Sequence, residues 1–199
     1  MVDDLVPQVS QSANGLRVAL AVAVALGLWR ALALADGSDY LAINPKGQVP
    51  LLQFDDGNVL SEGPAIVQYI ADQVPQKQLA PANGTLPRYR LQEWLTFIGT
   101  ELHKGFSPLF NPAVPESVHG VFRDKLIGRL MWIDTQLAGK QYLMGDTFTV
   151  ADAYLYTVSR WGALVKVDTS GLQHLAAFRE RMAARPAVQA AIKAEGLPG

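Results

Sequence analysis

Residues 44–63 read NPKGQVPLLQFDDGNVLSEG, and this stretch decides the fold of the first part of the chain. The segment 49–54 is short, apolar and bounded by turn residues, which predicts a β-strand. DDGN, at 55–58, predicts a turn, and NVLSE after it predicts a second strand, so the two form a hairpin. Pro64 then opens a segment with apolar residues at helical spacing, which predicts a helix ending near Val74-Pro75.

The composition is typical of a soluble globular protein of one or two domains. The chain has 199 residues, of which 49% are hydrophobic and 18% charged, with a formal net charge of −1. Because no block of Lys or Arg stands out, we expect no nucleic acid partner. Cysteine is absent, which excludes disulfides, a cysteine-ligated zinc and a thiol nucleophile. We expect no metal site and a cytoplasmic location.

The apolar run at residues 18–29 has two main interpretations. Its 12 residues are fewer than the roughly 20 that span a bilayer. We favour a buried helix, since alanine and leucine are strong helix formers. A cleaved signal sequence is the alternative, because ALALA at 31–35 offers a cleavage pattern. A third reading, with residues 16–34 as a membrane-surface anchor, fits the charge pattern poorly, so we expect no membrane partner.

After a polar segment at 76–87, the best candidate for a linker, the strand patterns end and helical patterns take over. An amphipathic helix is predicted at 88–106 and another at 121–139. Thr149 opens a third helix, with Asp152 placed to complete a capping box. Two short helices are expected around Pro186. The sequence therefore predicts a small α/β part followed by an all-α part of roughly five or more helices.

Several of these segments together resemble the glutathione S-transferases, in particular the bacterial beta class. The segments that carry the resemblance are NPKGQVP, the hairpin with LSEG and its helix, RYRLQEWLTFIGTELHKGFSPLF, TFTVADAYLYTVSRW and HLAAFRERMAARPAVQAA. The resemblance covers about residues 36–199 and leaves 1–35 unmatched. It implies a thioredoxin-like glutathione-binding domain at 1–76, atypical or incomplete, and an all-helical domain at 84–199.

The resemblance also implies a function. Members of the family conjugate glutathione, their co-substrate, to hydrophobic electrophiles, and they usually form homodimers with each site near the subunit interface. In this family the bond that corresponds to Val49-Pro50 is cis, and the valine backbone pairs with the cysteinyl backbone of glutathione like an added strand. The resemblance therefore implies a glutathione-binding segment at Gln48, Val49 and Pro50. The alternative is that Pro50 only starts a strand.

The segment SEGP, at 61–64, supplies the second expected part of the site. A helix N-terminus binds carboxylates through its free N–H groups and the positive end of the helix dipole. The resemblance implies that Glu62 and Gly63 hold the γ-glutamyl end of glutathione, with an acid meeting its amine. Many family members have serine in place of Gly63. The alternative is a capping turn with a solvated glutamate.

The segment ELHKG, at 101–105, supplies the third part. Thr96, Thr100 and His103 stand four and three residues apart, which places them on one face of an α-helix. The resemblance implies that His103 and Lys104 lie beside the glutathione thiol, with His103 in the catalytic role. It further implies that Thr96 reaches the glutathione of the neighbouring subunit, although relatives have Asn there. The alternative for His103 and Lys104 is a solvated helix end.

The first residues of the chain depart from the family pattern. Beta-class enzymes have a Tyr and a Cys in a motif like Y-x-P-G-A-C-S, and this chain has neither before Tyr40. Ser10 and Ser12 are the nearby hydroxyls, and Ser12 suits a helix cap better. A shifted reading frame, a misplaced start or a recombination event would each explain residues 1–35. A second hypothesis is therefore a non-catalytic protein that binds glutathione or dimerises.

Overall fold

The computed structural model describes residues 39–194. Their contacts divide them into two compact units, one formed by 39–67 with 186–194 and the other by 68–185. The division between residues 67 and 68 falls within the helix Gly63–Asp72. The helix expected at 18–29 and the cap expected at Ser12 lie outside the described residues.

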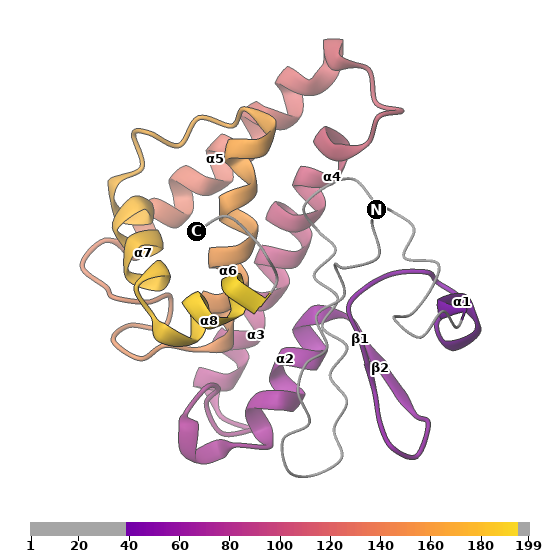
Figure 1. Cartoon of the computed structure of the whole chain (residues 1–199). Coiled ribbons are helices and arrows are strands. Elements are labelled where there is room, and N and C mark those ends of the chain that lie inside the picture. The colour runs from indigo at the N-terminus through magenta and orange to yellow at the C-terminus, as the bar shows by residue number, and fades with distance from the viewer. Residues whose placement is uncertain (1–38, 195–199) are drawn as a thin grey trace. The chain divides into compact units, whose positions relative to one another are not determined.

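The first unit contains the predicted hairpin (Figure 1). Strands β1 (Leu51–Gln53) and β2 (Val59–Ser61) pair antiparallel, with Leu52 opposite Leu60. Gly57 adopts φ +84° in the connecting turn, a left-handed conformation that glycine tolerates best. Helix α2 (Gly63–Asp72) follows the hairpin, and Pro64 is its second residue. A short helix α1 (Tyr40–Ile43), which the sequence did not predict, precedes the hairpin.

The second unit is helical. Its main helices are α3 (Leu86–Phe97), α4 (Lys104–Phe110), α5 (His119–Leu137), α6 (Val150–Ser159) and α7 (Gln173–Ala183), with a 3₁₀ turn at Arg160–Val165. Two further 3₁₀ turns span Pro75–Lys77 and Glu116–Val118. Helix α8 (Pro186–Ala194) belongs to the first unit. The predicted pair of short helices around Pro186 is therefore confirmed.

The core of the second unit follows the predicted apolar stripes. Leucine and isoleucine side chains of α3, α5 and the segment after α3 are almost fully buried, among them Leu91, Leu95, Ile98, Leu102, Leu126, Leu130 and Ile133. Helix α6 is buried along most of its length. Phe122 of α5 is only half-buried.

Helix α6 begins with the predicted capping box. The Asp152 carboxylate, which is fully buried, accepts hydrogen bonds from the Thr149 backbone at 2.8 Å and the Thr149 hydroxyl at 2.9 Å. It also accepts one from the Leu143 backbone at 2.8 Å. Burial raises the pKa of Asp152 above its ordinary value, although these hydrogen bonds act in the opposite direction. The capping box thus fixes both the start of α6 and the loop before it.

The prediction of one uninterrupted α-helix over 88–106 is wrong in its middle. Residues Ile98–His103 form a π-helical segment, in which the Lys104 N–H donates to the Gly99 carbonyl, five residues back. A π turn takes more residues than an α turn, so the α-helical spacing of Thr96, Thr100 and His103 does not hold through it. The apolar residues keep an α-helical period across this segment and therefore gave no sign of the change.

Among residues 39–194, no helix is both long enough and apolar enough to cross a membrane.

Candidate functional site

Two side chains of the preceding segment bind the backbone just before the Val49-Pro50 turn. The peptide bond is cis, as predicted. The carbonyl of Gln48 accepts hydrogen bonds from the Tyr40 hydroxyl at 2.5 Å and from the Asn44 amide at 2.6 Å. Asn44 is buried, and its amide also donates to the Tyr40 hydroxyl at 3.0 Å. The backbone just before Val49 is therefore fixed by partly buried hydrogen bonds.

The start of α2 lies against the same turn. A Cβ atom built on Gly63 would be 3.7 Å from Cγ of Pro50, an ordinary van der Waals distance. The structure thus brings together four of the predicted site residues, Val49 and Pro50 from the turn and Glu62 and Gly63 from the helix start. Gln48 is exposed beside them.

Glu62 has an unusual backbone. Its φ is +73°, in the left-handed region that residues other than glycine seldom adopt. Its carbonyl accepts hydrogen bonds from Ala65 and Ile66, both at 3.0 Å, so Glu62 stands at the cap position of α2 while its side chain is exposed. Strained backbone of this kind is concentrated at ligand-binding sites, where the surrounding structure holds it in place.

Lys46 completes this corner. Its ammonium group donates to the hydroxyl of Ser61 at 2.9 Å and lies 3.4 Å from the carboxylate of Glu62. Residues Lys46, Ser61, Glu62 and Gly63, together with the Val49-Pro50 turn, are called the hairpin corner below. The corner carries one cation and one anion side by side and is open to solvent. It suits a ligand end that also carries both charges.

Sequence reasoning missed three members of this arrangement. Tyr40, Asn44 and Lys46 lie in or beside NPKGQVP, but their partners are four to sixteen residues away and include backbone atoms. The Asn-Pro pair in that segment signals a turn. It does not signal which carbonyl the asparagine side chain will bind.

In the second unit, His103 is held by two aromatic residues. Its Nδ1 lies 2.8 Å from the hydroxyl of Tyr154, which comes from α6. Its ring meets Trp161 edge to face, with centroids 4.8 Å apart and planes at 85°. His103 is half-buried, and the adjoining Lys104 is exposed. Sequence reasoning missed both aromatic partners, because they stand more than fifty residues along the chain.

Trp161 also gathers two phenylalanines around it. Its ring centroid lies 5.8 Å from that of Phe106 and 6.0 Å from that of Phe110, both in edge-to-face contact. These three rings form an aromatic cluster on α4 and the turn after α6, and His103, at the end of the π-helical segment, lies beside it. Phe106 and Trp161 are buried, so most of this cluster packs α4 against the turn after α6, and Phe110 is half-buried at its edge.

Thr96 and Thr100 are exposed, whereas His103 is half-buried. The Thr100 hydroxyl donates to the Thr96 carbonyl at 3.0 Å, so this side chain already has a partner in its own helix.

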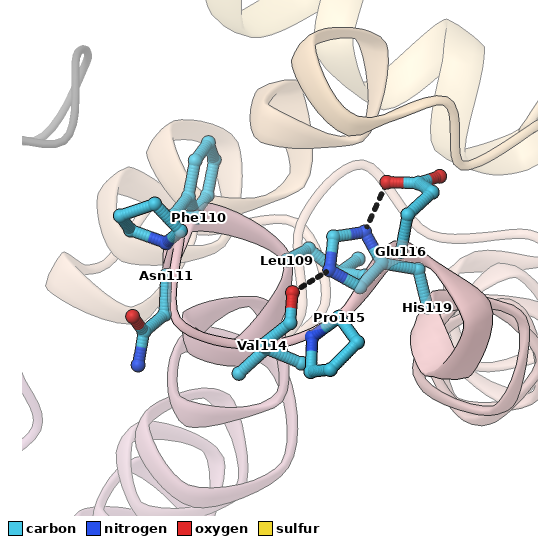
Figure 2. Close-up of a pocket in the computed structure, with 8 residues that line it drawn as sticks. Leu109, Phe110, Asn111, Val114, Pro115, Glu116 and His119 are labelled. Carbon is cyan, nitrogen blue, oxygen red and sulfur yellow. Dashed lines mark hydrogen bonds and ion pairs between the residues drawn. The ribbon is translucent and has the colours of Figure 1, made fainter.

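An open cavity of about 350 Å³ lies beyond the end of α4 (Figure 2). Its polar side chains are bound to each other. His119 Nδ1 lies 2.8 Å from the Glu116 carboxylate, and Nε2 lies 3.2 Å from the Val114 carbonyl. A hydrogen bond from Arg123 lowers the pKa of Glu116. These contacts stabilise the loop before α5, and we do not assign the cavity as a binding site.

The architecture, a small unit with a hairpin corner and a second unit made of helices, is the one that the sequence predicted, and comparison with known proteins identifies the family. Sequence models of the glutathione S-transferase C-terminal and N-terminal domains match residues 97–186 and 28–73. Glutathione S-transferase GstA of Escherichia coli O157:H7 is 51% identical over 164 residues, 82% of each chain. The chain belongs to the glutathione S-transferase family. The N-terminal match begins at residue 28, somewhat earlier than the expected limit at 36.

Solved structures agree. The ternary complex of BphK, a bacterial enzyme of this family, is 55% identical with a TM-score of 0.81, over 83% of this chain and 82% of that one. A sphingomonad glutathione S-transferase complexed with glutathione is 43% identical with a TM-score of 0.80, over 92% and 87%. The beta-class enzyme of Sphingomonas chungbukensis is 45% identical with a TM-score of 0.79, over 82% and 81%.

Proposed function

We propose that this protein is a glutathione S-transferase that conjugates glutathione to hydrophobic electrophiles. The observation that carries the proposal is the hairpin corner, in which the cis Val49-Pro50 turn lies against Gly63 and beside Glu62. In the proposal, residues 1–76 form the glutathione-binding domain and 84–199 the helical domain. The protein works in the cytoplasm, where glutathione is kept reduced.

In this proposal, the protein binds glutathione at two places, its cysteinyl part and its γ-glutamyl part. The Val49 backbone, next to Gln48 and Pro50, pairs with the cysteinyl backbone as an added strand would. The tightly held Gln48 carbonyl keeps that segment in place before the ligand arrives. The amine of the γ-glutamyl part binds the carboxylate of Glu62. The carboxylate of the γ-glutamyl part binds the N-terminus of α2 at Gly63. Lys46 balances the charge of Glu62 and adds a cation for the ligand's carboxylate.

His103 acts on the sulfur of glutathione, with Lys104 nearby in the chain. The thiolate is the nucleophile, so a hydrogen-bond donor or cation beside the sulfur favours reaction. The sulfur forms a bond to an electrophilic carbon, and the leaving group departs with its electron pair. The thiol proton passes to solvent. Phe110, the half-buried phenylalanine that packs on Trp161, offers an apolar ring to a flat electrophile.

The protein forms a homodimer in this proposal. Exposed aromatic side chains support it: Trp132 of α5 is 43% exposed, and its ring packs on Phe97 and Trp94 of α3 at centroid distances of 4.7 and 5.4 Å. Met131 beside it is 54% exposed. Exposed aromatic groups on adjoining helices are typical of protein interfaces. Thr96, next to Phe97, is then placed to reach the neighbouring subunit's glutathione, and Thr100 lies one turn further on.

A second candidate function is a glutathione-binding protein without turnover. The observation that favours it is the lack of a Tyr or Cys before Tyr40. The discriminating experiment pairs a steady-state assay, with glutathione and an aryl chloride, with calorimetric titration of glutathione. Turnover above the buffer rate supports the transferase. Binding without turnover supports the second candidate, and the absence of both overturns the whole proposal.

A further inference from the structure

His103 and Tyr154 are joined by a hydrogen bond as well as by ring packing. The Nδ1 atom of the histidine and the tyrosine hydroxyl are 2.8 Å apart, the distance of a good hydrogen bond. The two rings are also in edge-to-face contact, with centroids 5.8 Å apart and planes at 68°. Trp161 contacts the histidine ring edge to face as well. One ring nitrogen and the ring plane of His103 are therefore both held by residues beyond its own helix.

The backbone around His103 fits this arrangement. His103 ends the π-helical segment Ile98–His103, and such segments are frequent at functional sites. Gly99 lies in the same segment, where an added Cβ would stand 3.6 Å from the Tyr154 hydroxyl oxygen. The segment thus packs closely against the hydroxyl that contacts the histidine.

The direction of this hydrogen bond is linked to the tautomer of His103, because the Tyr154 hydroxyl can donate only to an Nδ1 that carries no proton. A neutral imidazole has one N–H donor and one bare nitrogen acceptor. A phenol at neutral pH carries its proton and can donate it. If Tyr154 donates to Nδ1, the proton of neutral His103 must be on Nε2. An N–H at Nε2 is a donor of the kind that stabilises a thiolate.

We propose that Tyr154 is a positioning residue that fixes the ring orientation of His103 and holds its proton on Nε2. This inference rests on the proposed function, because it gives His103 a role beside the sulfur. Tyr154 itself does not contact the reacting atoms in the proposal. It acts through His103, as a carboxylate or carbonyl orients the histidine of many other sites.

The first experiment reads the histidine directly and needs no activity. The chain has three histidines, so ring-nitrogen NMR of a ¹⁵N-labelled sample gives few signals to assign. Neutral His103 should carry its proton on Nε2 in the unchanged protein. In Tyr154→Phe, the ring stays but the hydroxyl is lost, and His103 should become a mixture of both tautomers. Tyr156→Phe is the matched control, since Tyr156 is two residues along the same helix and buried, with its ring under Arg160.

The NMR result has two outcomes that overturn the proposal. One is a neutral His103 protonated on Nδ1 in the unchanged protein. The other is a His103 spectrum that is the same in Tyr154→Phe as in the unchanged protein. The signals of His119 and His174 should not move in either variant, which shows that the fold is intact.

Kinetics separate this inference from the proposed function. Tyr154→Phe should lower kcat by about tenfold, because one hydrogen bond is lost, while KM for glutathione and the melting temperature stay the same. Tyr156→Phe should leave kcat unchanged. If His103→Gln abolishes turnover but Tyr154→Phe does not lower kcat, the positioning role is wrong and the proposed function stands. If His103→Gln keeps full activity, the catalytic role of His103 is wrong.

Discussion

The ammonium group of Lys46 lies 3.4 Å from the carboxylate of Glu62, across the start of α2. The two side chains are 52% and 70% exposed, so solvent screens their attraction and the pair adds little to stability. Its importance lies in the pattern of charge, one cation and one anion at a site for a ligand end with both.

Lys46→Gln should therefore weaken glutathione binding without changing the melting temperature. We expect a loss of about threefold in affinity, the scale of an exposed charge contact, and a larger loss at low salt than at high salt. Lys77→Gln, in the 3₁₀ turn Pro75–Lys77, is the control and should leave affinity unchanged. Equal affinities for Lys46→Gln and the unchanged protein at low salt would remove Lys46 from the site.

Gly63→Ser should be tolerated and should tighten binding. A Cβ atom added at Gly63 would be in ordinary van der Waals contact with Pro50 at 3.7 Å, and the backbone of Gly63 is not left-handed. The new hydroxyl gives the γ-glutamyl carboxylate one more donor, so we expect affinity to rise by about three- to tenfold. Gly57→Ser is the contrast, because its φ of +84° strains a serine. It should lower the melting temperature and leave affinity unchanged. Weaker binding in Gly63→Ser would contradict the predicted contact.

Arg88 and Asp72 offer a test of stability within the second unit. Both Arg88 Nη atoms donate to the Asp72 carboxylate, and Nη1 also donates to the Pro81 carbonyl at 2.7 Å. The Arg88 side chain is 3% exposed. Asp72→Asn weakens the partner of a buried cation, and we expect a loss of about 1–2 kcal/mol in the free energy of unfolding, after allowance for solvent at Asp72.

The pH dependence follows from the same pair. The hydrogen bond from Arg88 lowers the pKa of Asp72 below its ordinary value of 3.8. A carboxyl group with a lowered pKa stabilises the fold above that ordinary value, and the contribution is lost as pH falls through the folded-state pKa. The stability gap between the unchanged protein and Asp72→Asn should thus be full at pH 6 and shrink below pH 3.8. Asp124→Asn, on the exposed side of α5, should show no gap. A gap that does not vary with pH would contradict the charge pairing.

Trp132→Ala tests the homodimer. Buried aromatic anchors at interfaces commonly contribute 2 kcal/mol or more, so the dimer dissociation constant should rise by roughly thirtyfold or more. Val121→Ala is the control, since Val121 is 71% exposed on the same helix but outside the aromatic group. Sedimentation over a range of concentrations measures both variants. A dimer of unchanged strength in Trp132→Ala would place the interface elsewhere.

The sequence predicted the features that depend on neighbouring residues. The hairpin follows from DDGN between two apolar runs, and the start of α6 follows from Thr149 and Asp152, three residues apart. The Gln48 carbonyl and its donors were not predictable, because a side chain's choice of a backbone acceptor leaves no periodic pattern. The contact of His103 with Tyr154 joins residues 51 positions apart, and the π-helical segment between α3 and α4 leaves the apolar period unchanged.

The most direct test of the account is glutathione titration of Glu62→Gln by calorimetry, with a thermal melt of the same sample. If Glu62 holds the γ-glutamyl amine, the change removes a charge-assisted hydrogen bond worth about 1.5–3 kcal/mol, and affinity should fall by roughly ten- to a hundredfold. The melting temperature should hardly change, because the side chain is exposed. Unchanged affinity with a lowered melting temperature would leave Glu62 only the role of a helix cap and would contradict glutathione binding at the hairpin corner.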